Sequence, residues 1–130
     1  MEAVRNFFKN DRFADHLGIE LLEVSKGRAK AKMEIKDHHL NGINIAHGGA
    51  IFSLADLAFA VASNSHKTIA LAINASISFL KAVSGGTLIA EATEVSINPK
   101  LATYNIRVTN ENNELIALFQ GTVYRKKDKI

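Results

Sequence analysis

The sequence predicts an α+β fold in which a curved antiparallel sheet wraps around one long, apolar central helix. The helix is indicated by the run AIFSLADLAFAVASNS after Gly48-Gly49, which is rich in alanine and leucine, both strong helix formers. The sheet is indicated by segments of strand character on both sides of this run, with turn residues between them. Because the helix is apolar on nearly every face, it must be enclosed on most of its circumference.

Upstream of this helix we expect one short helix and two strands. Apolar residues from Val4 to Leu17 suggest a short amphipathic helix at the N-terminus. Gly27-Arg28 is typical of a turn between a strand that ends near Ser25 and one that begins at Ala29. In the second of these strands small or apolar residues alternate with charged ones, which predicts one buried and one solvated face.

Four further strands are predicted downstream of the helix, at about 69–80, 87–97, 101–109 and 114–125. The breaks between them hold Gly85-Gly86, Asn98-Pro99 and Asn112-Asn113, all of which suit turns. No repeat or linker divides the chain, so one domain over residues 1–130 is expected. Strands joined by hairpins pair antiparallel, and the simplest way for them to cover one apolar helix is to curl around it.

The composition narrows the chemistry that the chain can perform. Of its 130 residues 47% are hydrophobic and 22% are charged, which is typical of a folded globular chain. There is no cysteine, so disulfides, iron–sulfur clusters, zinc–thiolate sites and cysteine nucleophiles are excluded. Oxygen and nitrogen groups must carry any reaction.

Charge and hydropathy patterns indicate a cytoplasmic chain that does not enter the membrane. The first residues, MEAVRNFFKNDRF, lack the pattern of a secretory signal. The longest apolar stretch, Ala50 to Ala62, contains Asp56 and is shorter than the ~20 residues that span a bilayer. The net charge is +3, and its dense cluster from Arg125 to Lys127 is interpreted as a frayed, solvated tail. The aromatic residues are not interleaved with basic ones, so nucleic acid is not an expected partner.

Asp56 is the strongest anomaly in the sequence. It is the only ionisable residue between Gly48 and Ser65, in the middle of an otherwise apolar helix. Aspartate is a poor helix former, and an ionised carboxylate is costly to bury unless it is paired. A structural reading, in which Asp56 faces water or caps the backbone, competes with a catalytic one.

Gly48 and Gly49 stand where the helix begins, and free N–H groups at such a position can hold a developing oxyanion. His47 precedes them and suits a capping role. Gly49 and Asp56 are seven residues apart, so they share a helix face but lie ~10 Å apart along the axis. A nucleophile and an oxyanion donor must both come within ~3 Å of one carbonyl group. If both are used, they are expected to come from two subunits across a dimer interface.

These residues form the pattern N-G-x-x-x-x-H-G-G-x-x-x-x-x-x-D, from Asn41 to Asp56. The pattern resembles that of hotdog-fold acyl-CoA thioesterases of the phenylacetic-acid-degradation (PaaI) type. Ile77 to Lys81, followed by Gly85-Gly86, is similar to the third-strand motif of that family and the turn after it. The resemblance covers roughly residues 15–125. It implies a hotdog fold and hydrolysis of an acyl-CoA to the free acid and CoA.

The resemblance also implies roles for single residues. Asp56 would act as nucleophile or as base on water, and the backbone N–H of Gly48 would polarise the thioester carbonyl. Asn41 and His47 would orient the aspartate, the water or the loop, and two subunits would share each site in a dimer or a tetramer built from two dimers. Some relatives carry a serine that positions water where this chain has alanine, at Ala70 and Ala72.

Substrate contacts are expected at Gly49 and Lys81, and the charges of Lys100, Arg107 and Arg125 could also meet the phosphates of CoA. No metal is expected, because His38, His39 and His47 lack a metal-ligand spacing such as H-E-x-x-H, and no other cofactor motif is present. Two alternative functions stay open. One is a non-catalytic acyl-CoA-binding module, and the other is a hotdog dehydratase or hydratase, for which His47 is a weak acid or base candidate.

Overall fold

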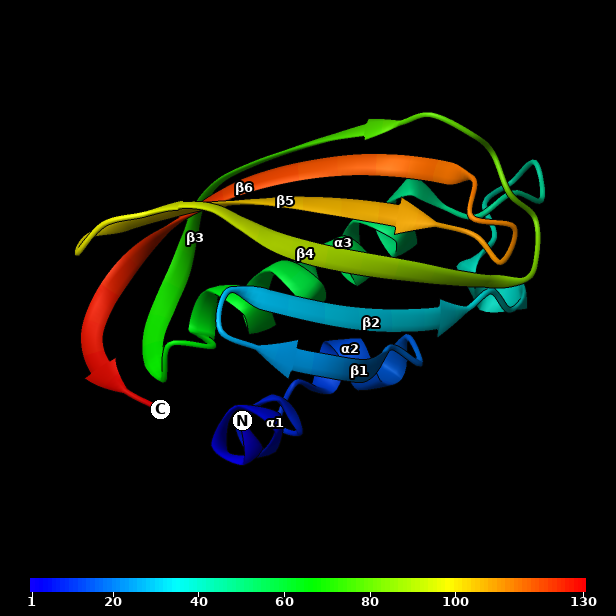
Figure 1. Ribbon diagram of the computed structural model, residues 1–130. Helices are drawn as coiled ribbons and strands as arrows, with labels where there is room; N and C mark the ends of the chain where they lie inside the picture. Colours follow the sequence, from blue (N-terminus) through cyan, green and yellow to red (C-terminus); the bar gives the residue numbers. More distant parts are fainter.

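The longest helix, α3 (Gly48–Asn64), lies along the inner face of a six-stranded antiparallel sheet (Figure 1). The computed structural model describes residues 1–130. The other helices are α1 (Glu2–Phe8), α2 (Arg12–His16) and the 3-10 turn η1 (Asp37–His39). The strands are β1 (Glu20–Ser25), β2 (Arg28–Glu34), β3 (Thr68–Phe79), β4 (Thr87–Ile97), β5 (Leu101–Thr109) and β6 (Leu115–Lys129).

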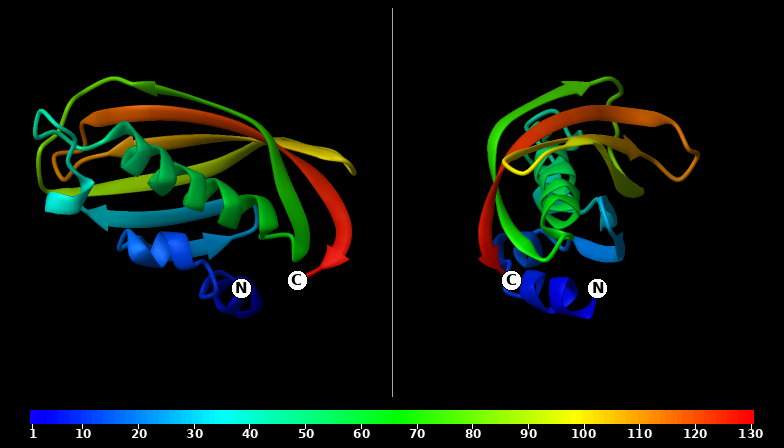
Figure 2. Two further views of the ribbon diagram at one scale, coloured as in Figure 1. Left: turned by 180° about the vertical axis from the view of Figure 1, so that it is seen from behind. Right: turned by 60° about the vertical axis from the view of Figure 1, so that its left-hand side comes forward.

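The sheet has the order β1-β2-β4-β5-β6-β3 and curls around α3, while α1 and α2 close part of the open side (Figure 2). Register shifts in β1, β3, β4 and β5 mark bulges, which increase the local twist and let the sheet bend. This arrangement confirms the predicted hotdog fold. The predicted helix and four downstream strands lie within a few residues of their expected ends.

The core forms between α3 and the concave face of the sheet. Phe59 of α3 is 1% exposed and packs against the rings of Tyr104 and Phe119, with ring centroids 5.9 and 5.5 Å away. Gly121 of β6 lies directly under the Phe59 ring, and a Cβ atom there would come within 2.5 Å of Phe59 Cζ. The Phe59 ring therefore occupies the space that a side chain at position 121 would fill.

Two predictions for the ends of the chain are wrong. The N-terminal segment forms two helices instead of one, because the Asp11 side chain accepts a hydrogen bond from Ala14 N–H and starts α2. The C-terminal cluster is not a frayed tail, since β6 continues to Lys129 and pairs with the beginning of β3. The Arg125 guanidinium donates to the carbonyl of Asn98, so backbone pairing and this bond hold the segment despite its charge.

No helix of the chain is long and apolar enough to cross a membrane.

We expect Gly121→Ala to lower the free energy of unfolding by about 1–3 kcal/mol, as overpacking of a core does. The buried Phe59 ring has no free space into which it could move. Gly85→Ala is the matched control, because a Cβ at Gly85 meets nothing within 4 Å. Urea denaturation of both variants measures the effect, and equal stabilities would contradict this account of the core.

Candidate active site

The start of α3 is built so that one backbone amide stays unpaired. His47 is the N-cap residue, and its Nδ1 accepts a hydrogen bond of 2.8 Å from Gly49 N–H. The next two amides, of Ala50 and Ile51, donate to the carbonyl of His47. Gly48 N–H has no acceptor within the chain. The helix start therefore offers Gly48, with Gly49 already engaged, as the donor for a ligand oxygen.

The loop before α3 is fixed by Asn41 and by bonds to neighbouring segments. Oδ1 of Asn41 accepts from the backbone N–H groups of Ile43 and Ile45, at 3.0 and 3.3 Å. Ala46 N–H donates to the carbonyl of Val83, at 2.7 Å. Within this chain Asn41 shapes the loop and makes no contact with Asp56. Its predicted part in orienting the catalytic groups stays a prediction.

His39 is buried, at 2% exposed, although it belongs to the polar segment before α3. Its Nδ1 accepts from Lys36 N–H and its Nε2 donates to the carbonyl of Leu17, at 2.9 and 2.8 Å. The carbonyl of His39 in turn accepts from His47 N–H, at 2.7 Å. His39 thus ties the loop before α3 to the end of α2. No sequence pattern marks these partners, which are far apart along the chain.

Asp56 lies on the only stripe of α3 that the fold leaves open. Between Ala50 and Asn64 every residue is buried except the half-buried Phe52, Ser53, Asp56 and Ala60, which follow each other at helical spacing. No hydrogen bond within the chain holds the Asp56 carboxylate. Burial raises the pKa of Asp56 above its ordinary value of 3.8, and the nearby charge of Asp11 raises it further. An unpaired carboxylate with a raised pKa, next to open space, is typical of a functional group.

The predicted site residues fall into two groups. Asn41, His47, Gly48 and Gly49 lie together at the start of α3, and Asp56 lies two turns further along the same helix. The end of β3 also reaches the first group, because the Phe79 ring lies beside Gly48.

Lys81 follows β3 and pairs with Glu114 across the sheet end. This pair lowers the pKa of the Glu114 carboxyl, and the largest cause is the hydrogen bond that Lys81 donates. The Lys81 ammonium already has an anionic partner within the chain. Its expected contact with a substrate phosphate stays a prediction.

A cleft of about 430 Å³ lies between α1, α2 and β1, with Phe8, Ile19, Leu21 and Leu57 among its apolar walls. Asp56 does not line this cleft, although Leu57 is its neighbour in sequence. No group of three or more histidine, cysteine, aspartate or glutamate side chains is arranged to hold a metal ion.

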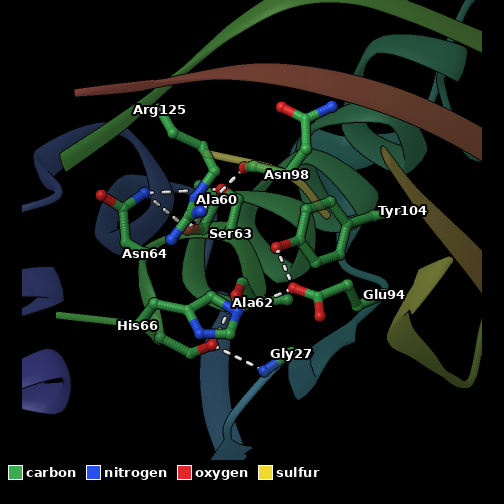
Figure 3. A network of polar contacts seen from close by, with 11 residues as sticks. Gly27, Ala60, Ala62, Ser63, Asn64, His66, Glu94, Asn98, Tyr104 and Arg125 are labelled. Atoms are coloured by element: carbon green, nitrogen blue, oxygen red, sulfur yellow. Dashed lines mark hydrogen bonds and ion pairs between the residues drawn. The ribbon is translucent and has the colours of Figure 1, made fainter. Parts of the chain in front are cut away.

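A network of polar side chains at the other end of α3 was not indicated by the sequence (Figure 3). Nε2 of His66 and the hydroxyl of Tyr104 both donate to Oε1 of Glu94, at 2.7 and 2.6 Å. Ser65 Oγ accepts from Gly27 N–H, at 2.7 Å. Burial acts to raise the pKa of Glu94, but the bonds from Tyr104 and His66 outweigh it, so this pKa lies below its ordinary value. Burial, followed by the bond to Glu94, raises the pKa of Tyr104.

The Glu94 carboxylate should stabilise the fold in a pH-dependent way. Because its pKa is lowered on folding, its contribution is present above its ordinary pKa of 4.5 and is lost as the pH falls through the folded-state value. We expect Glu94→Gln to lower the free energy of unfolding at pH 7 by about 1–3 kcal/mol and to flatten its acid dependence. Glu34→Gln, which removes only an exposed ion pair with Lys36, is the control. Similar denaturation curves for both variants from pH 3 to pH 8 would count against this role.

The fold and the helix-borne carboxylate together define the class of hotdog-fold proteins. Residues 43–117 match the family described as the thioesterase superfamily. A putative esterase from Archaeoglobus fulgidus is 52% identical over 127 residues, covering 96% of this chain and 82% of the relative. The acyl-coenzyme A thioesterase PaaI of Escherichia coli is 37% identical, with 91% of this chain and 85% of the relative covered.

Solved structures lead to the same family. The structure of E. coli PaaI, from the phenylacetic acid degradation operon, superimposes with a TM-score of 0.93 at 35% identity, over 97% of this chain and 92% of that one. The protein smu.793 from Streptococcus mutans, bound to acetyl CoA, has a TM-score of 0.82 at 26% identity, over 86% and 91%. The chain belongs to the thioesterase superfamily and to its PaaI-type hotdog proteins. It is a thioester hydrolase.

Proposed function

We propose that this protein hydrolyses acyl-CoA thioesters, with Asp56 of one subunit and the Gly48 amide of another acting on the same carbonyl group. The observation that carries the proposal is the half-buried Asp56 carboxylate, which has no partner and a raised pKa on the open stripe of α3. The named substrates of two relatives, and the acetyl CoA bound to a structural neighbour, support CoA esters as the substrate class.

The need for a second subunit follows from the geometry of α3. Gly48 and Asp56 are eight residues apart on one helix, about 12 Å along its axis, so they cannot both reach one carbonyl group. A partner helix that runs antiparallel to α3 would bring its own start to Asp56. The open stripe formed by Phe52, Ser53, Asp56 and Ala60 is the surface of α3 available for such a contact.

The free edge of the sheet supports pairing of two chains. β3 bonds only to β6, and its residues from Leu71 to Ser76 are all exposed, so both faces of the strand are uncovered there. Leu71 and Ile73 are 53% and 60% exposed. An edge strand with exposed apolar side chains is a site for pairing with another strand. We therefore propose that the protein forms a homo-oligomer, either a dimer or a dimer of dimers, and that its dimer interface lies along β3.

In the proposed reaction the carbonyl oxygen of the thioester accepts a hydrogen bond from Gly48 N–H. Asp56 either attacks the carbonyl carbon itself or takes a proton from the water that attacks. The carbon–sulfur bond then breaks, and the thiolate leaves and takes up a proton to give CoA. Where water attacks, this step releases the free acid directly. Where Asp56 attacks, it leaves a mixed anhydride of Asp56 and the acyl group, which a water molecule then hydrolyses to the free acid and the restored carboxylate. Incorporation of oxygen-18 from solvent into Asp56 in a single turnover indicates direct attack, with hydrolysis of the anhydride at the Asp56 carboxyl carbon.

The main alternative is a non-catalytic module that binds acyl-CoA at the same site without hydrolysing it. The two readings differ in turnover, because only the hydrolase releases free thiol continuously from a panel of acyl-CoAs. The family assignment favours hydrolysis.

Asp56→Asn should lower kcat by at least about 10³-fold, since it keeps the shape of the side chain but removes the charge. The same change should not destabilise the fold at pH 7. The raised pKa of Asp56 means that folding disfavours its ionised form, which lowers the free energy of unfolding. This destabilisation is present above the folded-state pKa and is lost as the pH falls from there toward the ordinary value of 3.8. Thiol release and urea denaturation measure the two effects. The exposed Asp15→Asn is the control, and full activity of Asp56→Asn would refute the proposal.

Gly48→Pro tests the backbone amide when it is compared with Gly48→Ala, because both substitutions add a Cβ beside Phe79 and only proline lacks the N–H. Proline lacks the N–H but suits the first position of a helix, and His47 already has the extended backbone, with ψ 135°, that a following proline requires. We expect kcat to fall by about 10²–10³-fold, as on loss of one oxyanion donor.

A mixing experiment tests the shared site. The Asp56→Asn chain keeps its Gly48 amide, and the Gly48→Pro chain keeps its carboxylate, so a dimer of one of each contains one intact site. Refolding the two inactive variants together should restore about a quarter of the normal activity, because half of the dimers are mixed and each has one working site. No recovery in dimers shown to be mixed would exclude a site shared between subunits.

A further inference from the structure

We propose that Phe79 is a positioning residue of the thioesterase site: its ring packs on Gly48, fixes the start of α3 and shields the Gly48 amide from water. The inference rests on the proposed role of that amide. It explains why the first residue of α3 is glycine, and it assigns a role to a half-exposed ring that the mechanism above does not use.

The contact joins two segments that are far apart along the chain. A Cβ atom on Gly48 would lie 3.1 Å from Cζ of Phe79, and 3.4 and 3.5 Å from its Cε1 and Cε2 atoms. These three ring atoms all face the Gly48 backbone, so the end of the ring lies on the helix start. Phe79 is the last residue of β3 and is 52% exposed, so the rest of the ring faces open space.

Helix propensity does not explain a glycine at this position. Glycine is less favourable than alanine in a helix by about 1 kcal/mol, and Gly48 has no positive φ that would call for it. Its absent side chain is explained by the ring. The glycine at position 49 has a similar explanation, because a Cβ there would lie 3.0 Å from Nδ1 of the capping His47.

Together the two rings leave one amide available. The His47 imidazole occupies Gly49 N–H, and the Phe79 ring covers one side of Gly48 while its N–H has no acceptor. An apolar ring beside a donor keeps water away and lowers the local dielectric constant, which strengthens a hydrogen bond to a developing oxyanion. The benefit grows as charge develops, so the ring should act on kcat more than on KM.

A double-mutant cycle between residues 48 and 79 tests the inference. Gly48→Ala keeps the amide but adds the Cβ that meets the ring, and we expect kcat to fall about tenfold. In a Phe79→Ala background the same change should cost less than about twofold, because the ring is gone. Phe79→Ala alone should lower kcat about tenfold with KM changed less than about threefold, and Phe79→Leu should recover most of the loss.

Controls separate this effect from damage to the fold or the oligomer. Leu80→Ala removes an equally exposed apolar side chain, at 53%, next to Phe79 in the chain and should keep normal kinetics. The oligomeric state and the urea denaturation curve are recorded for each variant. In NMR spectra the Gly48 amide proton should move on Phe79→Ala, since the ring current is lost, but not on Leu80→Ala.

The outcomes are distinct. Additive losses in kcat from the two substitutions, or an unmoved Gly48 amide signal, overturn the inference while the proposed hydrolysis stands. A wild-type protein that releases no thiol from any acyl-CoA overturns the proposed function and with it the catalytic role of Phe79. Coupled losses, with rescue by leucine and the amide shift, support both.

Discussion

Enclosure of α3 by the curved sheet is the constraint on which the rest of the molecule depends. The helix is apolar around most of its circumference, and the sheet, α1 and α2 cover all of it except one stripe. The Phe59 ring fits against β6 because residue 121 is a glycine. A single uncovered stripe means that any polar group of the helix interior is either buried or placed on that stripe. Asp56 is on the stripe, where it keeps limited access to water and to a ligand.

The two ends of α3 differ in how completely their polar groups are hydrogen-bonded within the chain. At the C-terminal end His66 bonds to Glu94 (Figure 3), and Ser65 Oγ accepts from Gly27 N–H. At the N-terminal end the Gly49 amide is capped by His47, and the Gly48 amide before it is left without an acceptor. An unpaired amide costs free energy unless water or a ligand reaches it. Hydrogen bonding is thus complete at one end of the central helix, and one amide stays free at the other end, where we propose that the substrate binds.

Much of the fold could be predicted from the sequence because its signals are local. The alternation in β2 and the turn residues between β3, β4, β5 and β6 each depend on a few neighbouring positions, and the ends of these strands lie close to their expected places. The cap of α2 at Asp11 is also a local signal, and it was missed. The continuation of β6 beyond residue 125 was missed for another reason: its charged side chains suggest solvation, whereas its backbone pairs with β3 whatever its side chains are.

The candidate site could be predicted only in part, because its residues are marked by local anomalies but its contacts are not. Asp56 stands out as one charge in an apolar helix, and Gly48 as a glycine at a helix start. By contrast, the bond from His39 to Leu17, the effect of Asp11 on Asp56 and the Phe79 ring beside Gly48 join residues that are 22 or more positions apart. Such contacts depend on the curvature of the sheet and on the placement of α2. The spacing within α3 is different, because it can be read from the sequence alone. The proposed oxyanion donor and the carboxylate are eight positions apart on one helix, and this distance already argues for a second subunit.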